Sequence, residues 1–278
     1  MNKLHPQEHP VLSYSQINTF LTCRRMWYWQ YIEDLTPKLK SKPLMIGDLT
    51  HRLLDAYYRG ELQAGDIKRL YEFALQLFPD NPPEEVYDNV MEAAVLLNGY
   101  VRQNQEDELQ VTSPEVWLEK DFGDFTLVTR LDAICQTPDK RKWRMEHKTT
   151  SRVDSIYLRG QRRGLQTGIC QWLMDELLPE RISGTIFNLL VKKKTPEFPR
   201  QAVPRSQLVV DLAKETVLGV VRSLQRGDLY PSMKCSQYNR PCDFEPLCRS
   251  DTPSTRESLY TSRKEVMESS KSLKWTNV

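Results

Sequence analysis

The sequence predicts an α/β protein in which a central mixed β-sheet is flanked by helices. The first hundred residues carry mainly helical patterns, and three β-type runs separated by turns follow between residues 115 and 148. A further helical pattern then precedes an apolar strand over residues 184–191. Helices and strands that follow one another in this way are typical of a sheet covered by helices.

Apolar residues at helical spacing predict the N-terminal helices. The first of these has Ser15 as its expected N-cap. Further helices are expected over residues 45–58, 67–77 and 84–103, and the prolines between residues 79 and 83 separate the last two.

Alternation of apolar and polar residues predicts strands over residues 116–122, 125–135 and 143–148. Turn residues separate these runs, so we expect an antiparallel meander. Helices are expected over residues 162–178 and 207–226, one on each side of the apolar strand.

The composition is that of a globular protein. The chain has 278 residues, of which 39% are hydrophobic and 27% charged. The net charge of +2 leaves nucleic-acid binding open, because a local basic patch suffices for it. There is no phosphate-binding G-x-x-x-x-G-K-[ST] loop, which argues against an ATP-driven motor.

We expect one large domain over residues 13–250, between a polar leader (residues 1–12) and a tail (residues 251–278). Within it, residues 13–110 are mainly helical, residues 115–195 hold the sheet, and residues 196–250 hold a helix and a cysteine-rich segment. Neither a membrane-spanning run nor a signal peptide is evident, so a cytoplasmic protein without membrane contact is expected. In a reducing compartment, the six cysteines need an explanation other than disulfides.

Asp132, Glu146 and Lys148 form a candidate catalytic set. Residues i and i+2 of a strand share a face, so Glu146 and Lys148 point into one site while His147 offers its backbone carbonyl. Asp132, on the preceding strand, can reach the same place. Carboxylate and carbonyl oxygens suit Mg²⁺ or Mn²⁺, and a lysine beside the metal can assist hydrolysis of a phosphodiester. Taken alone, however, a Glu-x-Lys pair is more often an ordinary surface pair.

The segments Arg130-Leu131-Asp132-Ala133-Ile134 and Met145-Glu146-His147-Lys148-Thr149-Thr150 resemble the motifs of the PD-(D/E)XK nuclease superfamily. The similarity covers roughly residues 13–250 and points to the RecB-like branch, with CRISPR-associated RecB-like exonucleases, the AddB nuclease domain and phage nucleases. It implies a restriction-endonuclease-like core, Mg²⁺ or Mn²⁺ as the cofactor, and an exonuclease acting on DNA ends.

Two further elements resemble this branch. Gly47-Asp48-Leu49-Thr50-His51 is similar to its G-x-x-x-H element, which implies that His51 is a metal ligand together with Asp132, Glu146 and His147. Without the resemblance, His51 is more simply a half-buried packing residue. Gln166 matches the glutamine of a Q-x-x-x-Y element and is a candidate catalytic residue, although Cys170 stands in place of the tyrosine. Gln166 is equally compatible with an ordinary helix surface.

Four cysteines form a second candidate site. Cys235, Cys242 and Cys248 lie in a stretch interrupted by prolines, where neither helix nor strand is expected, and Cys23 is the best fourth ligand. The resemblance implies a structural 4Fe–4S cluster that joins the two ends of the domain. Four thiolates also suit Zn²⁺, which is the alternative occupant. The remaining two cysteines, Cys135 and Cys170, are expected to be buried thiols.

Basic side chains near the third strand are the expected DNA contacts, namely Arg152, Arg159, Arg162 and Arg163. A lysine triplet at residues 192–194 is as compatible with a solvated charged face. An aromatic group at residues 27–31 can stack on bases, or pack around Cys23.

The expected function is that of a metal-dependent deoxyribonuclease, with DNA as the partner. Any unwinding would come from a helicase or recombination partner. The alternatives are a non-catalytic DNA-binding or recombination-accessory protein with the same fold, and a zinc-stabilised interaction protein.

Overall fold

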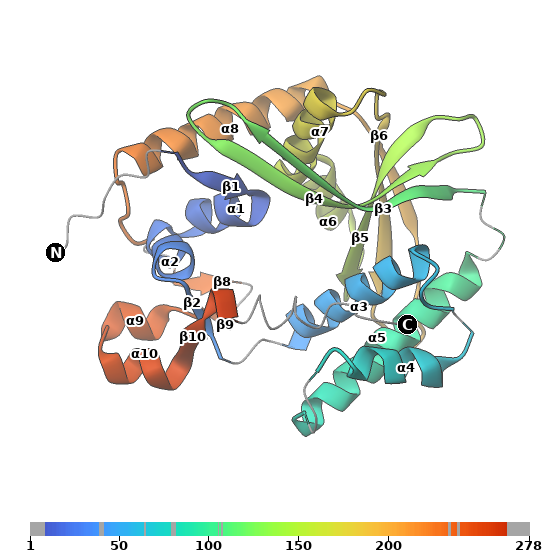
Figure 1. Cartoon of the computed structure of the whole chain (residues 1–278), viewed down its shortest axis with the longest axis horizontal. Helices are drawn as coiled ribbons and strands as arrows, with labels where there is room; N and C mark the ends of the chain where they lie inside the picture. Colours follow the sequence, from blue (N-terminus) through green and yellow to red (C-terminus); the bar gives the residue numbers. More distant parts are fainter. Residues whose placement is uncertain are drawn as a thin grey trace. The chain divides into compact units, whose positions relative to one another are not determined.

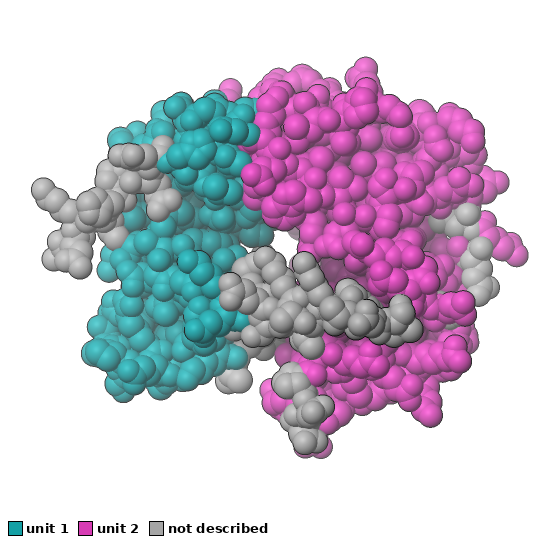
Figure 2. Space-filling model, viewed as in Figure 1, with its two compact units in different colours: residues 1–40, 121–126, 216–278 teal, residues 41–120, 127–215 magenta. Residues whose placement is uncertain are grey.

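The structure is a computed structural model that describes residues 9–38, 42–63, 65–78, 82–104, 106, 108–232, 235–237 and 240–265. The chain forms two compact units (Figure 2). Unit 1 combines residues 1–40, 121–126 and 216–278, and unit 2 combines residues 41–120 and 127–215. None of the helices in the described residues is long and apolar enough to cross a membrane.

Unit 2 is built on a mixed β-sheet (Figure 1). Its strands are β3 (Gln110–Asp121), β4 (Thr126–Gln136), β5 (Lys142–Thr150), β6 (Gly184–Val191) and β7 (Arg200–Pro204). They lie in the order β3, β4, β5, β6, β7, with β5 and β6 parallel and the pairs β4–β5 and β6–β7 antiparallel. The predicted α/β class with a mixed sheet is confirmed.

Two helices cover one face of this sheet, and a third packs against them. The three are α3 (Lys42–Tyr58), α4 (Ile67–Leu75) and α5 (Glu84–Gln103), and their apolar sides form one buried cluster that includes Leu190 of β6. Gly47 brings α3 close to β5, because a Cβ added there would lie 3.3 Å from Oγ1 of Thr149. The N-terminal half of α3 therefore approaches the strand that carries the candidate motif.

The other face carries α6 (Ser155–Arg162) and α7 (Leu165–Leu177). The single helix expected over residues 162–178 is wrong at its start. Asp154 caps α6 by accepting a hydrogen bond from the Tyr157 amide, and Gly164, with an extended backbone, begins α7 separately. The next helix, α8 (Gln207–Gln225), packs closely on α7, because a Cβ on Gly168 would lie only 2.6 Å from the Val209 carbonyl oxygen.

Unit 1 joins segments from both ends of the chain. Its N-terminal part holds β1 (Val11–Ser13), α1 (Tyr14–Thr22), α2 (Arg24–Trp27), a π-helical turn η1 (Tyr28–Ile32) and β2 (Leu35–Pro37). The N-cap of α1 is Ser13, whose hydroxyl accepts the Gln16 amide, and not the expected Ser15.

The C-terminal part of unit 1 contains the short strands β8 (Ser236–Gln237) and β9 (Arg240–Pro241), then α9 (Glu245–Arg249), α10 (Pro253–Leu259) and β10 (Tyr260–Ser262). The expectation of neither helix nor strand around the three C-terminal cysteines is therefore wrong. Pro246 lies in the first turn of α9, where its missing N–H costs no helical hydrogen bond. Strand β10 pairs antiparallel with β2, so the two ends of the chain meet in one small sheet.

Candidate functional site

Glu146 and Lys148 lie side by side on β5. Their side chains share one face of the strand, and Nζ of Lys148 is 2.5 Å from Oε1 of Glu146. Only 2% of Glu146 is exposed, whereas 26% of the Lys148 side chain is. The carboxylate is therefore held inside the protein, and the lysine side chain is partly accessible from solvent.

Gln166 in the first turn of α7 connects these two side chains. Its Nε2 donates to Oε1 of Glu146 at 2.9 Å, and its Oε1 accepts a hydrogen bond from Nζ of Lys148 at 2.9 Å. An amide that donates at one end and accepts at the other fixes both motif side chains in one arrangement.

Arg144 is a neighbour of Glu146 that the sequence analysis missed. It lies two residues earlier on the same face of β5, is 1% exposed, and donates from Nη2 to Oε2 of Glu146. The same alternation that placed Glu146 and Lys148 together could have indicated it. Both oxygens of the Glu146 carboxylate are thus engaged by cationic or amide donors.

Asp132 on β4 and His51 on α3 form a second group. Nδ1 of His51 lies 3.3 Å from Oδ1 of Asp132, and the His147 amide donates to Oδ2 of Asp132 at 2.7 Å. Burial alone would raise the pKa of Asp132, but the neighbouring His51 ring and the His147 amide hold it well below its usual value. Asp132 is therefore ionised at neutral pH.

The His147 ring is buried on the opposite face of β5 from Glu146, among aromatic side chains. It stacks on Tyr58 with ring centroids 5.7 Å apart and meets Tyr100 edge-on at 6.1 Å. Burial lowers the pKa of His147 to about 3, so the ring is neutral at neutral pH.

A polar network continues behind this ring. The Tyr100 hydroxyl accepts hydrogen bonds from Nδ2 of Asn188 at 2.9 Å and Nη2 of Arg200 at 3.0 Å, and it lies 2.5 Å from the Tyr58 hydroxyl. Nε of Arg200 donates to Oδ1 of Asn188 at 2.7 Å. The network holds together the strands and helices that surround His147.

These residues supply the kinds of ligand that Mg²⁺ and Mn²⁺ accept. They are the carboxylates of Asp132 and Glu146, the imidazole of His51 and the backbone carbonyl of His147. Asp132 and His51 already meet, but Glu146 is turned to Arg144, Lys148 and Gln166. Among the described residues, no three His, Cys, Asp or Glu side chains are grouped so as to hold a metal ion. The donor set fits such an ion in kind, and Glu146 would complete it by offering an oxygen toward Asp132.

The four cysteines of the second candidate site line one hollow in unit 1. Cys23, Cys235, Cys242 and Cys248 all line this hollow, which is partly open to solvent, but among the described residues no three cysteines lie close enough together to hold a metal ion. Trp29 and Phe244, which stack with ring centroids 6.2 Å apart, pack beside the hollow. Burial raises the pKa values of the Cys242 and Cys248 thiols, so binding of a metal group there would release protons.

The other two cysteines lie in unit 2. Cys135 and Cys170 are both buried, and the Cys170 thiol lies 3.3 Å from Oγ1 of Thr129. These two thiols are separate from the hollow lined by the other four.

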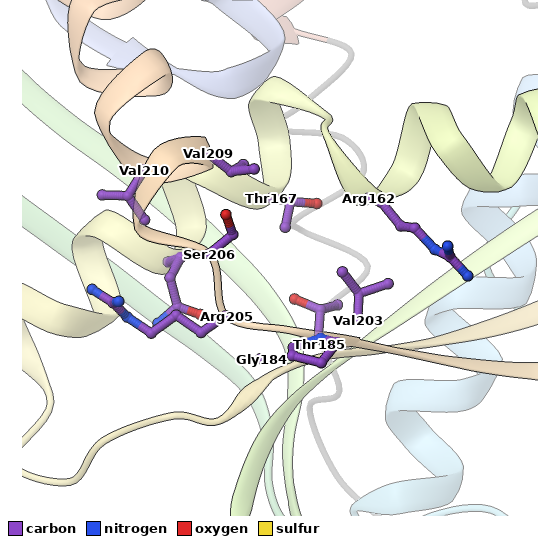
Figure 3. Close-up of a pocket in the computed structure, with 11 residues that line it drawn as sticks. Arg162, Thr167, Gly184, Thr185, Val203, Arg205, Ser206, Val209 and Val210 are labelled. Carbon is purple, nitrogen blue, oxygen red and sulfur yellow. The ribbon is translucent and has the colours of Figure 1, made fainter.

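The candidate DNA contacts lie after β5. Arg152, Arg159, Arg162 and Arg163 are all exposed, and Arg152 forms an ion pair with Asp154 at 3.3 Å. Arg162 also lines a small hollow with Thr185 and Ser206, but its guanidinium points away from both (Figure 3). In the lysine triplet, Lys193 pairs with Glu197 at 2.9 Å.

Residues 11–249 match the PD-(D/E)XK nuclease superfamily. The chain belongs to this superfamily. Its members are nucleases that typically use Mg²⁺ or Mn²⁺, so the core of this chain is a nuclease core.

A similar solved structure is that of a Eubacterium rectale protein with the provisional description of an exonuclease. It is 14% identical, with 84% of this chain and 88% of that chain covered and a TM-score of 0.55, which shows a shared fold. The protein SSO0001 is 17% identical over 62% of this chain and 74% of its own. Its TM-score of 0.29 is too low to indicate a shared fold. No curated protein matches the chain.

Proposed function

We propose that this protein is a metal-dependent DNA nuclease that acts on DNA ends. The observation that carries the proposal is the arrangement of Glu146 and Lys148, side by side on β5 and cross-linked by Gln166. Asp132, already ionised and paired with His51, lies on the adjacent strand. The PD-(D/E)XK membership supports nuclease chemistry, and action at DNA ends rests on the motif resemblance.

In this proposal, Asp132, Glu146, His51 and the His147 carbonyl hold Mg²⁺ or Mn²⁺. When bound, such an ion polarises the phosphodiester and lowers the pKa of a water. Lys148 places its ammonium group where a phosphate oxygen can approach and offsets the negative charge that develops there. Gln166 holds the Lys148 and Glu146 side chains in place through its two hydrogen bonds. The neutral His147 ring packs on the opposite face of β5.

The test is digestion of end-labelled linear DNA, single- and double-stranded, with Mn²⁺ or Mg²⁺. We expect Glu146→Ala and Lys148→Ala each to lower the rate by at least about a hundredfold, since each removes a group that acts in the transition state. Lys68→Ala is the matched control, because it removes an exposed lysine on α4 that also pairs with a glutamate, Glu72. Equal rates in all variants would overturn the site assignment.

Circular DNA of the same sequence separates the end-dependent reaction from internal cleavage. An exonuclease leaves covalently closed circles intact while it degrades the linear form. Cleavage of both forms at similar rates would contradict the end-dependent part of the proposal. Binding of DNA without cleavage under any metal would favour the non-catalytic accessory function.

DNA binding is assigned to the exposed arginines after β5. Combined substitution of Arg159, Arg162 and Arg163 by alanine is expected to weaken binding and to make its salt dependence shallower, because fewer phosphates are neutralised. Substitution of three surface lysines elsewhere on unit 2 provides the charge-matched control. An unchanged salt slope in the arginine variant would exclude these residues as phosphate contacts.

For unit 1, the proposal is a structural 4Fe–4S cluster bound by Cys23, Cys235, Cys242 and Cys248. The shared hollow and its aromatic wall support a bound metal group, and the resemblance supports iron–sulfur over zinc. Thiolates from residues 23 and 248 would cross-link the two ends of the chain, which limits the unfolded ensemble as a long disulfide loop does.

Metal analysis and the visible spectrum of anaerobically purified protein test this assignment. The wild type is expected to be brown and to contain iron, and Cys242→Ala is expected to be colourless and less stable. Cys170→Ala is the control, because Cys170 is a buried thiol that lies apart from the hollow. Stoichiometric zinc without iron would establish the zinc alternative, and retained colour in Cys242→Ala would remove Cys242 from the ligand set.

A further inference from the structure

Arg144 is an unusual residue for its position. It occupies the middle of β5, is 1% exposed, and forms a buried ion pair with Glu146. Its Nε and Nη1 have no hydrogen-bond partner among the described residues. Neighbouring positions of the strand hold apolar Trp143 and Met145, which pack in a hydrophobic cluster on the other face.

Stability alone does not account for a buried arginine here. Removing a guanidinium from water is energetically unfavourable, and replacing a buried ion pair by apolar residues is often neutral or stabilising. Two unsatisfied donors add to the cost. The pair between Arg144 and Glu146 is therefore better explained by an effect on Glu146 than by a contribution to folding.

The charges around Glu146 are balanced without a metal ion. Asp132 and Glu146 supply two carboxylates, and Arg144 and Lys148 supply two cationic side chains that both pair with Glu146. A divalent ion bound to this set would leave an excess positive charge of about +2, since no further carboxylate among the described residues is grouped with it. Within a few ångströms and at low dielectric, such an excess is strongly unfavourable.

The hydrogen bonds that Glu146 accepts also oppose metal binding. A carboxylate offers about four lone-pair positions. Arg144 takes one on Oε2, and Lys148 and Gln166 take two on Oε1. A metal ligated by Glu146 must therefore share Oε2 with the guanidinium or displace one of these donors.

We propose that Arg144 is a resident counter-cation of Glu146 that opposes entry of the divalent metal ion. The free protein then binds Mg²⁺ or Mn²⁺ weakly, and the negative charge of a DNA phosphate offsets Arg144 and favours the metal-loaded site. Arg144 is a positioning residue in this scheme, since it acts through Glu146. The inference rests on the proposed function, because it takes Glu146 as a metal ligand.

Isothermal titration calorimetry of Mn²⁺ into the DNA-free protein tests this directly. Arg144→Met removes the charge and the donors, Arg144→Gln removes the charge but keeps an N–H donor, and Arg144→Lys keeps the charge. We expect the Met and Gln variants to bind Mn²⁺ about tenfold or more tighter than the wild type, and the Lys variant to bind like the wild type. Arg205→Met is the matched control, because Arg205 pairs with Asp175 at 2.6 Å away from β5.

If Arg144 merely orients Glu146, Met would weaken Mn²⁺ binding and Gln would leave it unchanged. That result overturns the proposal, as does equal affinity in all the Arg144 variants. If the Met variant does not fold, the comparison of Gln with Lys still isolates the charge. Failure of wild type and Gln variant alike to bind Mn²⁺, while the wild type cleaves DNA with Mn²⁺, also overturns it. Absence of both binding and cleavage would instead count against the proposed function.

Discussion

Tyr100→Phe is the most direct test of the polar network behind His147. The substitution removes one hydroxyl and leaves the ring, so the packing is unchanged. Because that hydroxyl accepts from both Asn188 and Arg200, its own proton is directed to the Tyr58 oxygen, 2.5 Å away. Three hydrogen bonds are thus lost together.

The size of the expected loss in stability follows from the burial of the hydrogen-bond partners. Asn188 is 1% exposed, so the Nδ2–H that loses its acceptor cannot form a hydrogen bond with water instead. An unsatisfied buried group costs about 1–3 kcal/mol, while Arg200 is half-buried and can partly rehydrate. We expect the free energy of unfolding to fall by about 3 kcal/mol in Tyr100→Phe.

The assay is urea denaturation followed by circular dichroism. Tyr57→Phe is the control, because the Tyr57 hydroxyl has no hydrogen-bond partner in the described part of the chain, and its effect should stay within about 0.5 kcal/mol. A loss below about 1 kcal/mol for Tyr100→Phe, with an unchanged m-value, would refute the assignment of three buried bonds to this hydroxyl.

Three further outcomes are expected. Gly168→Ala should destabilise the protein by about 2–4 kcal/mol in thermal unfolding, because its Cβ would lie 2.6 Å from the backbone of α8; wild-type stability would contradict that packing. Gln166→Ala should lower kcat about tenfold with little change in KM, since the two motif side chains lose their cross-link, and a change confined to KM would argue for DNA binding instead. Arg256 holds the pKa of Glu33 below its usual value by a hydrogen bond, so this pair stabilises unit 1 above about pH 4 and the gain is lost as pH falls through the lowered pKa. Arg256→Met should flatten that acid dependence of stability, and identical profiles would exclude the pair.

The elements with strong local patterns were predictable. Residues 184–191 and 84–103 coincide with β6 and α5, because a fully buried strand and a helix with one apolar side leave clear periodicities in the sequence. The antiparallel meander followed from alternation and turn residues. Strand β7 was not predicted, since it is a short edge strand with the pattern Arg-Gln-Ala-Val-Pro and little apolar content.

The candidate site was predictable only in part. Alternation correctly assigns Glu146 and Lys148 to one face, but it gives no information on which oxygen each donor takes. The role of Arg144 depends on its burial, which tertiary packing sets and strand alternation does not reveal. Helix α9 is not predictable from Pro246 alone, because a proline interrupts a helix in its interior but is favoured in its first turn.

The composition of unit 1 also bears on how the protein is made. Its N-terminal part ends at residue 40, and its C-terminal part begins at residue 216. At about 5–20 residues per second, translation leaves roughly 175 residues, or on the order of ten to forty seconds, between the two. During that time Met26, Trp29 and the Cys23 thiol lack their C-terminal partners, while the strands and helices of unit 2 emerge. The small sheet of β2 and β10 can therefore close only after the whole of unit 2 has been synthesised.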